Sequence, residues 1–340
     1  MTSRFEELRD LLSRSAYFKL VCGAGNEDAE EVRRLSIIYT LAGCNGFDVS
    51  ATPSIVRACV EGITEAYQLA PQLEKSIPIR PFITVSVGMS GDHHVRKAYI
   101  IDDCIDCGLC IPACPTDAIP DNYDIIRELC IGCGDCEAAC PPKVAAVRYE
   151  HDDKILTEIL PACIEAGAEN IELHASVPDD ESIMAEWETV TAIQQDNFIS
   201  MCLDRFHLSD YRLIERIRKA KEIAGDRLII QADGIPMSGG VDDYNTTLQA
   251  IAIADVITKD LISKDKKFRD LPILLSGGTN GRTAELAKLC NVKYGGISVG
   301  THARKIVEEQ AKQDNFGTNL DNLTEAVRLA EDLVTRSLAQ

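Results

Sequence analysis

Short runs of apolar residues alternate along most of the chain with longer segments in which apolar residues recur every three or four positions. The short runs have the length and composition of buried strands, and the longer segments have the period of helices. The sequence predicts eight strands, at residues 19–22, 46–50, 81–87, 170–174, 198–203, 227–232, 272–276 and 296–299. Strands that alternate with helices favour a parallel sheet with right-handed crossovers. Eight such units predict an α/β fold of the (β/α)8 barrel type, and a doubly wound open sheet is the alternative.

Three segments depart from this alternation. The first twelve residues predict a short amphipathic helix, and residues 318–340 predict a terminal helix whose apolar face would cover the barrel or meet a partner. Between the third strand and its helix, which is expected to begin near Asp152, lies an insertion rich in cysteine. The predicted organisation is the first part of the barrel at 1–90, the insertion at 91–150, the second part of the barrel at 151–317 and the terminal helix at 318–340.

The insertion carries the strongest chemical signal. The chain has fourteen cysteines, and eight of them lie between residues 104 and 140, in two runs that each follow the spacing C-x2-C-x2-C-x3-C-P. This is the spacing of bacterial two-cluster ferredoxins, in which three cysteines of a run hold one [4Fe–4S] cluster and the fourth ligates the other cluster. The predicted ligands are Cys104, Cys107, Cys110 and Cys140 for cluster 1, and Cys130, Cys133, Cys136 and Cys114 for cluster 2.

Two other roles for these cysteines are less compatible with the pattern. A tetrahedral zinc site uses four ligands in two pairs, whereas here two runs of four each end in proline. A disulfide scaffold is typical of short secreted chains, but this chain is long, and its charged first twelve residues are not expected to form a secretory signal. In a barrel, the loop after the third strand lies on the C-terminal face. We therefore expect a ferredoxin-like α+β module beside the barrel mouth, with the short apolar runs at 98–101 and 144–147 paired as its edge strands.

Glycines follow the last two predicted strands. The first loop reads Ser-Gly-Gly-Thr-Asn at 276–280, and the second reads Gly-Thr-His at 300–302. Loops in these places of a barrel commonly bind phosphate, because glycine exposes backbone N–H groups. A phosphate-containing ligand or FMN is therefore expected near Gly277, Gly278, Gly300 and Thr301. The alternative is that these glycines only make tight turns.

Polar residues at other predicted strand ends are candidates for acid–base or substrate-binding roles, although each alone is more typical of a helix cap or a loop contact. His174 is the best single candidate because histidine titrates near neutral pH. The others are Asp48, Ser50, Thr52, Asp204, Arg205, Asp233 and Ser276. Six further cysteines have the apolar surroundings of small core residues: Cys22, Cys44, Cys59, Cys163, Cys202 and Cys290.

Charge and hydropathy limit the partners. With 35 basic and 54 acidic residues the net charge is −19, which disfavours nucleic acid and leaves either a solvated acidic surface or a basic protein partner. No apolar stretch is long enough for a membrane span. The clustered cysteines indicate a reducing compartment, so we expect the protein in the cytoplasm.

The chain resembles the light dependent period A family of cyanobacteria. The resemblance lies in the two cysteine motifs at 104–115 and 130–141, in the segments 21–28 and 46–63, and in LSGGTN at 275–280. It implies an iron–sulfur redox sensor that reports photosynthetic or quinone redox state to the circadian clock. It also implies clock-input partners, namely input histidine kinases and KaiA-type proteins. An oxidoreductase whose clusters feed a flavin or a phosphorylated substrate stays open, and a plain electron carrier is a third possibility.

Overall fold

The computed structural model describes residues 2–23, 25–88, 96–127, 129–130, 132–150, 154–205, 208–234 and 242–338. The boundary expected between residues 90 and 91, and the helix start expected near Asp152, lie outside these ranges.

Eight parallel strands close into a barrel, as the sequence predicts. The strands follow the order β1-β10-β9-β8-β7-β6-β3-β2 around it, so consecutive barrel strands are paired and β1 closes the barrel against β10. Their bounds are β1 Tyr17–Gly23, β2 Gly46–Ser50, β3 Phe82–Gly88, β6 Asn170–His174, β7 Ile199–Leu203, β8 Leu228–Asp233, β9 Ile273–Ser276 and β10 Gly296–Val299. Each lies within two residues of its predicted position, because fully buried strands read as continuous apolar runs.

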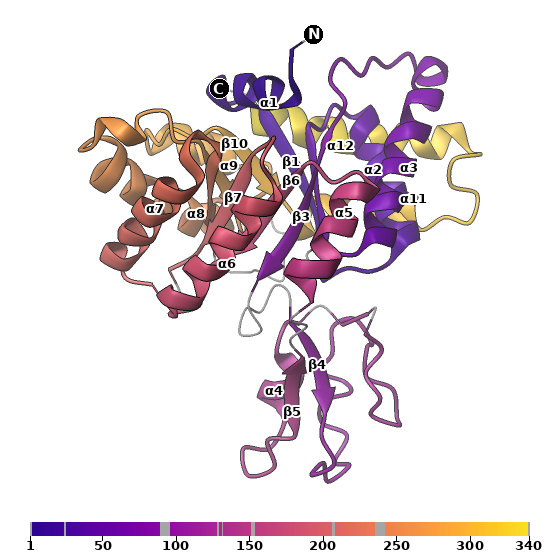
Figure 1. Cartoon of the computed structure of the whole chain (residues 1–340). Coiled ribbons are helices and arrows are strands. Elements are labelled where there is room, and N and C mark those ends of the chain that lie inside the picture. Colours follow the sequence, from indigo (N-terminus) through magenta and orange to yellow (C-terminus); the bar gives the residue numbers. More distant parts are fainter. Residues whose placement is uncertain are drawn as a thin grey trace.

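Helices surround the barrel (Figure 1). Several begin with an aspartate or serine side chain that accepts a hydrogen bond from a first-turn amide, as at Asp28, Asp179, Ser209 and Asp243. The helices are α2 Ala29–Leu41, α3 Pro53–Leu69, α5 Leu160–Ala166, α6 Asp180–Ile193, α7 Asp210–Ala224, α8 Tyr244–Ile257, α9 Thr283–Leu289, α10 Thr301–Ile306 and α11 Glu308–Ala311. Shorter 3-10 or π segments are Ala70–Leu73, Ile155–Ile159, Gly225–Arg227, Thr258–Ile262 and Lys266–Phe268.

The two predicted terminal helices both pack against the barrel. Helix α1, Arg4–Ser13, buries Leu8, Leu11 and Leu12 against residues at the N-terminal ends of the strands, among them Tyr17 and Phe82. Helix α12, Leu320–Leu338, contacts α2, β1 and β10. Its predicted apolar face is buried throughout: Leu323, Val327, Ala330 and Val334. The apolar faces of both helices are therefore buried against the barrel.

The cysteine-rich insertion forms a small module at the C-terminal end of the barrel (Figure 1). It contains a two-stranded antiparallel sheet, β4 Lys97–Ile100 and β5 Val147–Glu150, and one short helix, α4 Asp135–Ala139. The sequence predicts the second strand at the apolar run 144–147, but the strand begins only at Val147. Residues before it form a turn, with the Val144 amide donating to the Pro141 carbonyl at 2.8 Å and Ala145 at a φ of 44°.

Within the described part of the chain, every helix is too short or too polar to cross a lipid bilayer.

Candidate iron–sulfur centre and barrel interior

The structure gathers the eight module cysteines into the two groups that the spacing predicts. Each group lines a separate small cavity. The first cavity is lined by Cys104, Cys107, Cys110 and Cys140. The second is lined by Cys114, Cys130, Cys133 and Cys136. The fourth cysteine of each run therefore leaves its own loop and joins the other group, which is the crossed arrangement of two-cluster ferredoxins.

The two cysteine loops share one backbone conformation. In the first loop Asp106 and Gly108 have φ angles of 53° and 72°, and in the second Gly132 and Gly134 have angles of 70° and 90°. These positions are equivalent, since each pair occupies the second and fourth places after the first cysteine of its run. Left-handed residues at alternate positions turn the chain tightly, so that three cysteine side chains point to one side. Glycine takes this conformation without steric cost, whereas Asp106 is one of the residue types that tolerate it.

Backbone amides donate to the cysteine sulfurs in both groups. Ala118 N lies 3.3 Å from Cys114 Sγ, and Ala146 N lies 3.3 Å from Cys140 Sγ, so each crossing cysteine has one amide partner. The Ala98 amide similarly donates to Cys130 Sγ at 3.4 Å. Such N–H···S bonds stabilise thiolates and help set the reduction potential of an iron–sulfur cluster. The donor set therefore fits two cubanes.

Lys97 joins the second cysteine group to the barrel. Its ammonium group donates to the Cys130 carbonyl at 2.7 Å and to the Gly25 carbonyl, in the loop between β1 and α2, at 2.6 Å. A third bond reaches the Arg127 carbonyl at 3.0 Å, and the Glu27 carboxylate lies 3.7 Å away. Burial lowers the pKa of Lys97, and the nearby Glu27 opposes that shift. The group that contains Cys130 is thereby tied to the barrel mouth.

A cleft of about 920 Å³ lies between the module and the barrel mouth. One wall comes from the ends of β2 and β3 and includes Ser50, Ser86 and Gly88. Module residues, among them Lys97 and Tyr149, form the facing wall. The volume falls within the range of small-molecule sites in proteins. Because Lys97 also binds the Cys130 carbonyl, a molecule in the cleft would lie close to the second cysteine group.

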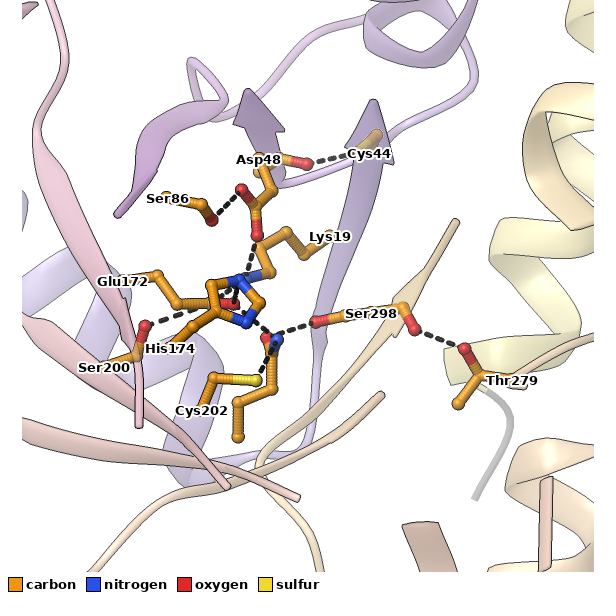
Figure 2. A network of polar contacts seen from close by, with 12 residues as sticks. Lys19, Cys44, Asp48, Ser86, Glu172, His174, Ser200, Cys202, Thr279 and Ser298 are labelled. Carbon is orange, nitrogen blue, oxygen red and sulfur yellow. Dashed lines mark hydrogen bonds and ion pairs between the residues drawn. The ribbon is translucent and has the colours of Figure 1, made fainter. Parts of the chain in front are cut away.

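Beneath the mouth, a buried polar network fills the centre of the barrel (Figure 2). Lys19 on β1 forms ion pairs with Asp48 on β2 at 2.8 Å and with Glu172 on β6 at 2.5 Å. All three side chains are at most 2% exposed. Burial alone would lower the pKa of Lys19, but the two carboxylates raise it, so the lysine is charged. Burial raises the pKa of Glu172, and the charge of Lys19 acts in the opposite direction.

Further side chains extend the network around the barrel. Ser86 donates to Asp48 Oδ1 at 2.5 Å, and Ser200 donates to Glu172 Oε2 at 3.1 Å. The Gln231 amide donates to Glu172 Oε1 at 2.5 Å and accepts from Ser298 Oγ at 3.2 Å. Strands on opposite sides of the barrel are thus linked through one carboxylate. Ser86 also lines the cleft, so the network reaches the mouth.

The residues predicted to bind phosphate lie directly after β9 and β10, which are paired parallel strands. Gly277 and Gly278 have φ angles of 70° and 68°, and a Cβ at Gly277 would lie 2.4 Å from the Gly234 amide nitrogen. Close packing against Gly234 therefore explains why position 277 is a glycine. Gly300 precedes α10, and the hydroxyl of Thr301 accepts from Arg304 Nη2 at 3.4 Å. A ligand at these four residues stays a prediction.

The other strand-end candidates separate into two groups. Most are buried at the barrel mouth or in its interior: Asp48, Ser50, His174, Asp204, Asp233 and Ser276. Arg205 instead pairs with Asp210 at 2.8 Å and is about one-third exposed, and Thr52 precedes α3 without a side-chain capping bond. Of the six scattered cysteines, five are buried as expected. Cys290 is exposed at the end of α9, contrary to the expectation of a core position.

Sequence reasoning missed Lys19, Glu172, Gln231 and Lys97. Three of them sit inside runs that were interpreted as buried strands, where a charged or amide side chain is costly without a partner. A polar residue within a predicted barrel strand is therefore the available signal. It does not reveal the partner, because Lys19 and Glu172 are 153 residues apart.

Comparison with known families agrees with this geometry. Residues 98–119 and 123–144 match the sequence model of the 4Fe–4S binding domain, so this is an iron–sulfur protein. Residues 163–336, just over half of the chain, match the model of the light dependent period A C-terminal domain. The chain belongs to the light dependent period A family. A relative of this family, Light dependent period A from Synechococcus elongatus, is 29% identical over 316 residues, covering 88% of this chain and 83% of the relative.

Solved structures with a similar shape include the YdjI aldolase from Escherichia coli K12. It is 8% identical, with 96% of this chain and 90% of that chain covered and a TM-score of 0.46. Another is the 4-hydroxy-tetrahydrodipicolinate synthase from Methylacidiphilum fumariolicum SolV, which is 10% identical, with 92% and 77% covered and a TM-score of 0.42. The barrel assignment rests on the strand pairing within this chain rather than on these similarities.

Proposed function

We propose that this member of the light dependent period A family is a redox sensor with two [4Fe–4S] clusters, cluster 1 on Cys104, Cys107, Cys110 and Cys140 and cluster 2 on Cys130, Cys133, Cys136 and Cys114. The observation that carries the proposal is the grouping of these thiols around two cavities in a module tied to the barrel mouth by Lys97. When bound, a cubane supplies one-electron chemistry. A reducing compartment such as the cytoplasm, where thiols stay free, is part of the proposal.

The surface around the first cysteine group has the character of a docking face. Ile105 and Leu109 are 61% and 52% exposed, and Cys107 between them is also exposed. Asp102, Asp103 and Asp106, which are exposed and close to these residues in sequence, add negative charge to this surface. A partner with an apolar centre and a basic rim would fit it. Reduction adds a further negative charge close to this face, so binding of such a partner would depend on oxidation state.

The partners proposed are clock-input proteins, namely input histidine kinases or KaiA-type proteins, and the input signal is photosynthetic or quinone redox state. The description of the family, light dependent period, supports an input linked to light and a role in timing. The redox partner that donates electrons would use the same exposed face, since Lys97 ties the loop of Cys130 in the second group to the barrel mouth.

The cleft supports a second candidate function. In this alternative the protein is an oxidoreductase whose clusters pass electrons to a flavin or a phosphorylated substrate in the barrel. The cleft opens beside Lys97, which contacts the Cys130 loop, and its volume suits a small molecule. FMN or a phosphate held at Gly277, Gly278, Gly300 and Thr301 belongs to this candidate.

The two functions can be separated by binding measurements on anaerobically purified protein. The affinity for an input histidine kinase and for a KaiA-type protein is measured with oxidised and reduced clusters at two salt concentrations. The sensor predicts at least a several-fold difference between the oxidation states that shrinks as salt increases.

The docking face is tested in the same assay with the variant Ile105→Ser. Leu289→Ser is the matched control, because Leu289 is 71% exposed on α9 of the barrel. Weaker binding of Ile105→Ser, with unchanged binding of Leu289→Ser, supports the proposed docking face. Equal affinity in both oxidation states, together with turnover of a small molecule, would instead favour the oxidoreductase.

A further inference from the structure

Three side chains of different chemistry meet inside the barrel, outside the cysteine module. Glu172 and His174 are two residues apart on β6, so both point to the interior. Cys202 lies on β7 directly opposite His174 in the strand register. One donor atom from each of the three lies within 4.8 Å of the others, and all three residues are buried. The distance from His174 Nε2 to Glu172 Oε1 is 3.6 Å.

These distances suit a common ligand. Two donors that each lie about 2.0–2.1 Å from a tetrahedral ion are roughly 3.4 Å apart, close to the separation of the histidine nitrogen and the glutamate oxygen. A sulfur, an imidazole nitrogen and a carboxylate oxygen are moreover the three donor types that zinc accepts in proteins. Side chains that were only filling a barrel would more often be apolar and branched.

The surrounding charges favour a cation. Lys19 is shared between two buried carboxylates, Asp48 and Glu172. Asp233, also buried, adds further negative potential at Glu172. Buried charges need compensation, and a divalent cation beside Glu172 would provide it.

The Gln231 amide lies beside the position that such an ion would take. Its Nε2 donates to Glu172 Oε1 at 2.5 Å and lies 3.6 Å from Cys202 Sγ. This partly positive N–H group thus sits between two of the three donors. Rotation of the amide, with loss of the bond from Ser298, would turn its oxygen toward the ion and offer a fourth ligand.

From this arrangement we infer a mononuclear zinc site in the barrel, with Glu172, His174 and Cys202 as ligands and Gln231 as the neighbouring fourth group. The site is separate from the cysteine module and does not depend on the proposed redox function. Three protein ligands with a replaceable fourth group are typical of zinc sites that bind a water or a substrate. Zinc binding would displace the thiol proton of Cys202.

The test uses full-length, anaerobically purified protein with its iron in place. Zn²⁺ alone is added, the excess is removed, and zinc and iron per chain are measured by mass spectrometry. We expect about one tightly bound zinc without loss of iron. X-ray absorption at the zinc edge should show one sulfur among nitrogen and oxygen neighbours. A zinc environment of four sulfurs would mean that zinc had entered the cysteine module, and this result, like the absence of tight binding, would overturn the inference.

Variants identify the ligands. Cys202→Ser and His174→Gln should each weaken zinc binding at least tenfold, whereas Cys163→Ser should not. Cys163 is the matched control because it is equally buried but lies on α5, outside the network. Circular dichroism and iron content verify that each variant is folded. Zinc retained at full affinity by a folded Cys202→Ser variant would exclude the site.

Discussion

The barrel and the cysteine module are stabilised in different ways. The barrel has a continuous apolar core to which every strand contributes. In the described part of the module, the core cluster comprises seven buried residues, and three of these are cysteines proposed to bind iron: Cys110, Cys130 and Cys136. Its two strands are four residues long and pair only with each other. A two-stranded sheet of this size is marginal in water without additional support.

The difference shows that different kinds of residue determine the structures of the two regions. Barrel strands are specified by apolar side chains, which bury surface whether or not a ligand is present. The module is specified by ligand spacing and by left-handed loop residues, and most of its folding free energy must come from the clusters. Loss of the clusters should therefore affect one region and spare the other.

The largest expected effect is that of removing the clusters. After iron chelation under reducing, anaerobic conditions, the amides of β4 and β5 should exchange hydrogen roughly 100-fold faster or more, because the module loses its main source of stability. Amides of barrel strands such as β7 should exchange at their original rates. Hydrogen exchange with mass spectrometry measures both regions in one sample. Retained protection in β4 and β5 would show that the module folds without iron.

The second expected effect lies in the barrel alone. Lys19→Met should lower the free energy of unfolding by about 3–5 kcal/mol, since it leaves two buried carboxylates without their cation. Chemical denaturation measures the change, and the iron content should be unaffected. Lys75→Met is the control, because Lys75 pairs with Glu331 at 2.7 Å in a half-exposed setting and should cost at most about 1 kcal/mol. Equal losses in the two variants would mean that the interior network adds little stability.

The third effect concerns the closed N-terminal end of the barrel. Leu8 of α1 is 1% exposed, and Leu8→Ala should destabilise the barrel by about 2–4 kcal/mol through lost burial and a residual cavity. Leu320→Ala, at a 38% exposed position, should change stability by less than about 1 kcal/mol. Thermal unfolding measures both variants. A small effect of Leu8→Ala would indicate that the packing of α1 adds little to the stability of the barrel.

The smallest effect is expected where the two regions meet. Lys97→Met removes bonds to the Gly25 and Cys130 carbonyls, and we expect a loss of about 1–3 kcal/mol in the docking of the module. Limited proteolysis should then cut near residues 97–100 several times faster, while barrel unfolding stays unchanged. Lys143→Met, at an exposed position in the module, is the control. Unchanged proteolysis of the Lys97 variant would show that other contacts hold the module.

The two regions also differ in how much could be predicted from sequence. Apolar periodicity located all eight barrel strands, and ligand spacing grouped the cysteines as the structure does. The interior network could not be predicted, because Lys19, Asp48 and Glu172 come together only when the barrel closes. The second module strand was misplaced, since the apolar run at 144–147 is interrupted by a turn at Ala145 that hydrophobicity alone does not reveal.

The central claim, that the module holds two [4Fe–4S] clusters with crossed ligands, is tested most directly by iron and sulfide analysis with electron paramagnetic resonance. Anaerobically purified protein should contain about eight iron and about eight acid-labile sulfide per chain, and the reduced form should show two interacting cubanes. In Cys114→Ser, the signal of the cluster on Cys130, Cys133 and Cys136 should change, while that of the cluster on Cys104, Cys107 and Cys110 persists. Zinc without sulfide, or a Cys114→Ser variant altered only at the cluster next to it in sequence, would contradict the account.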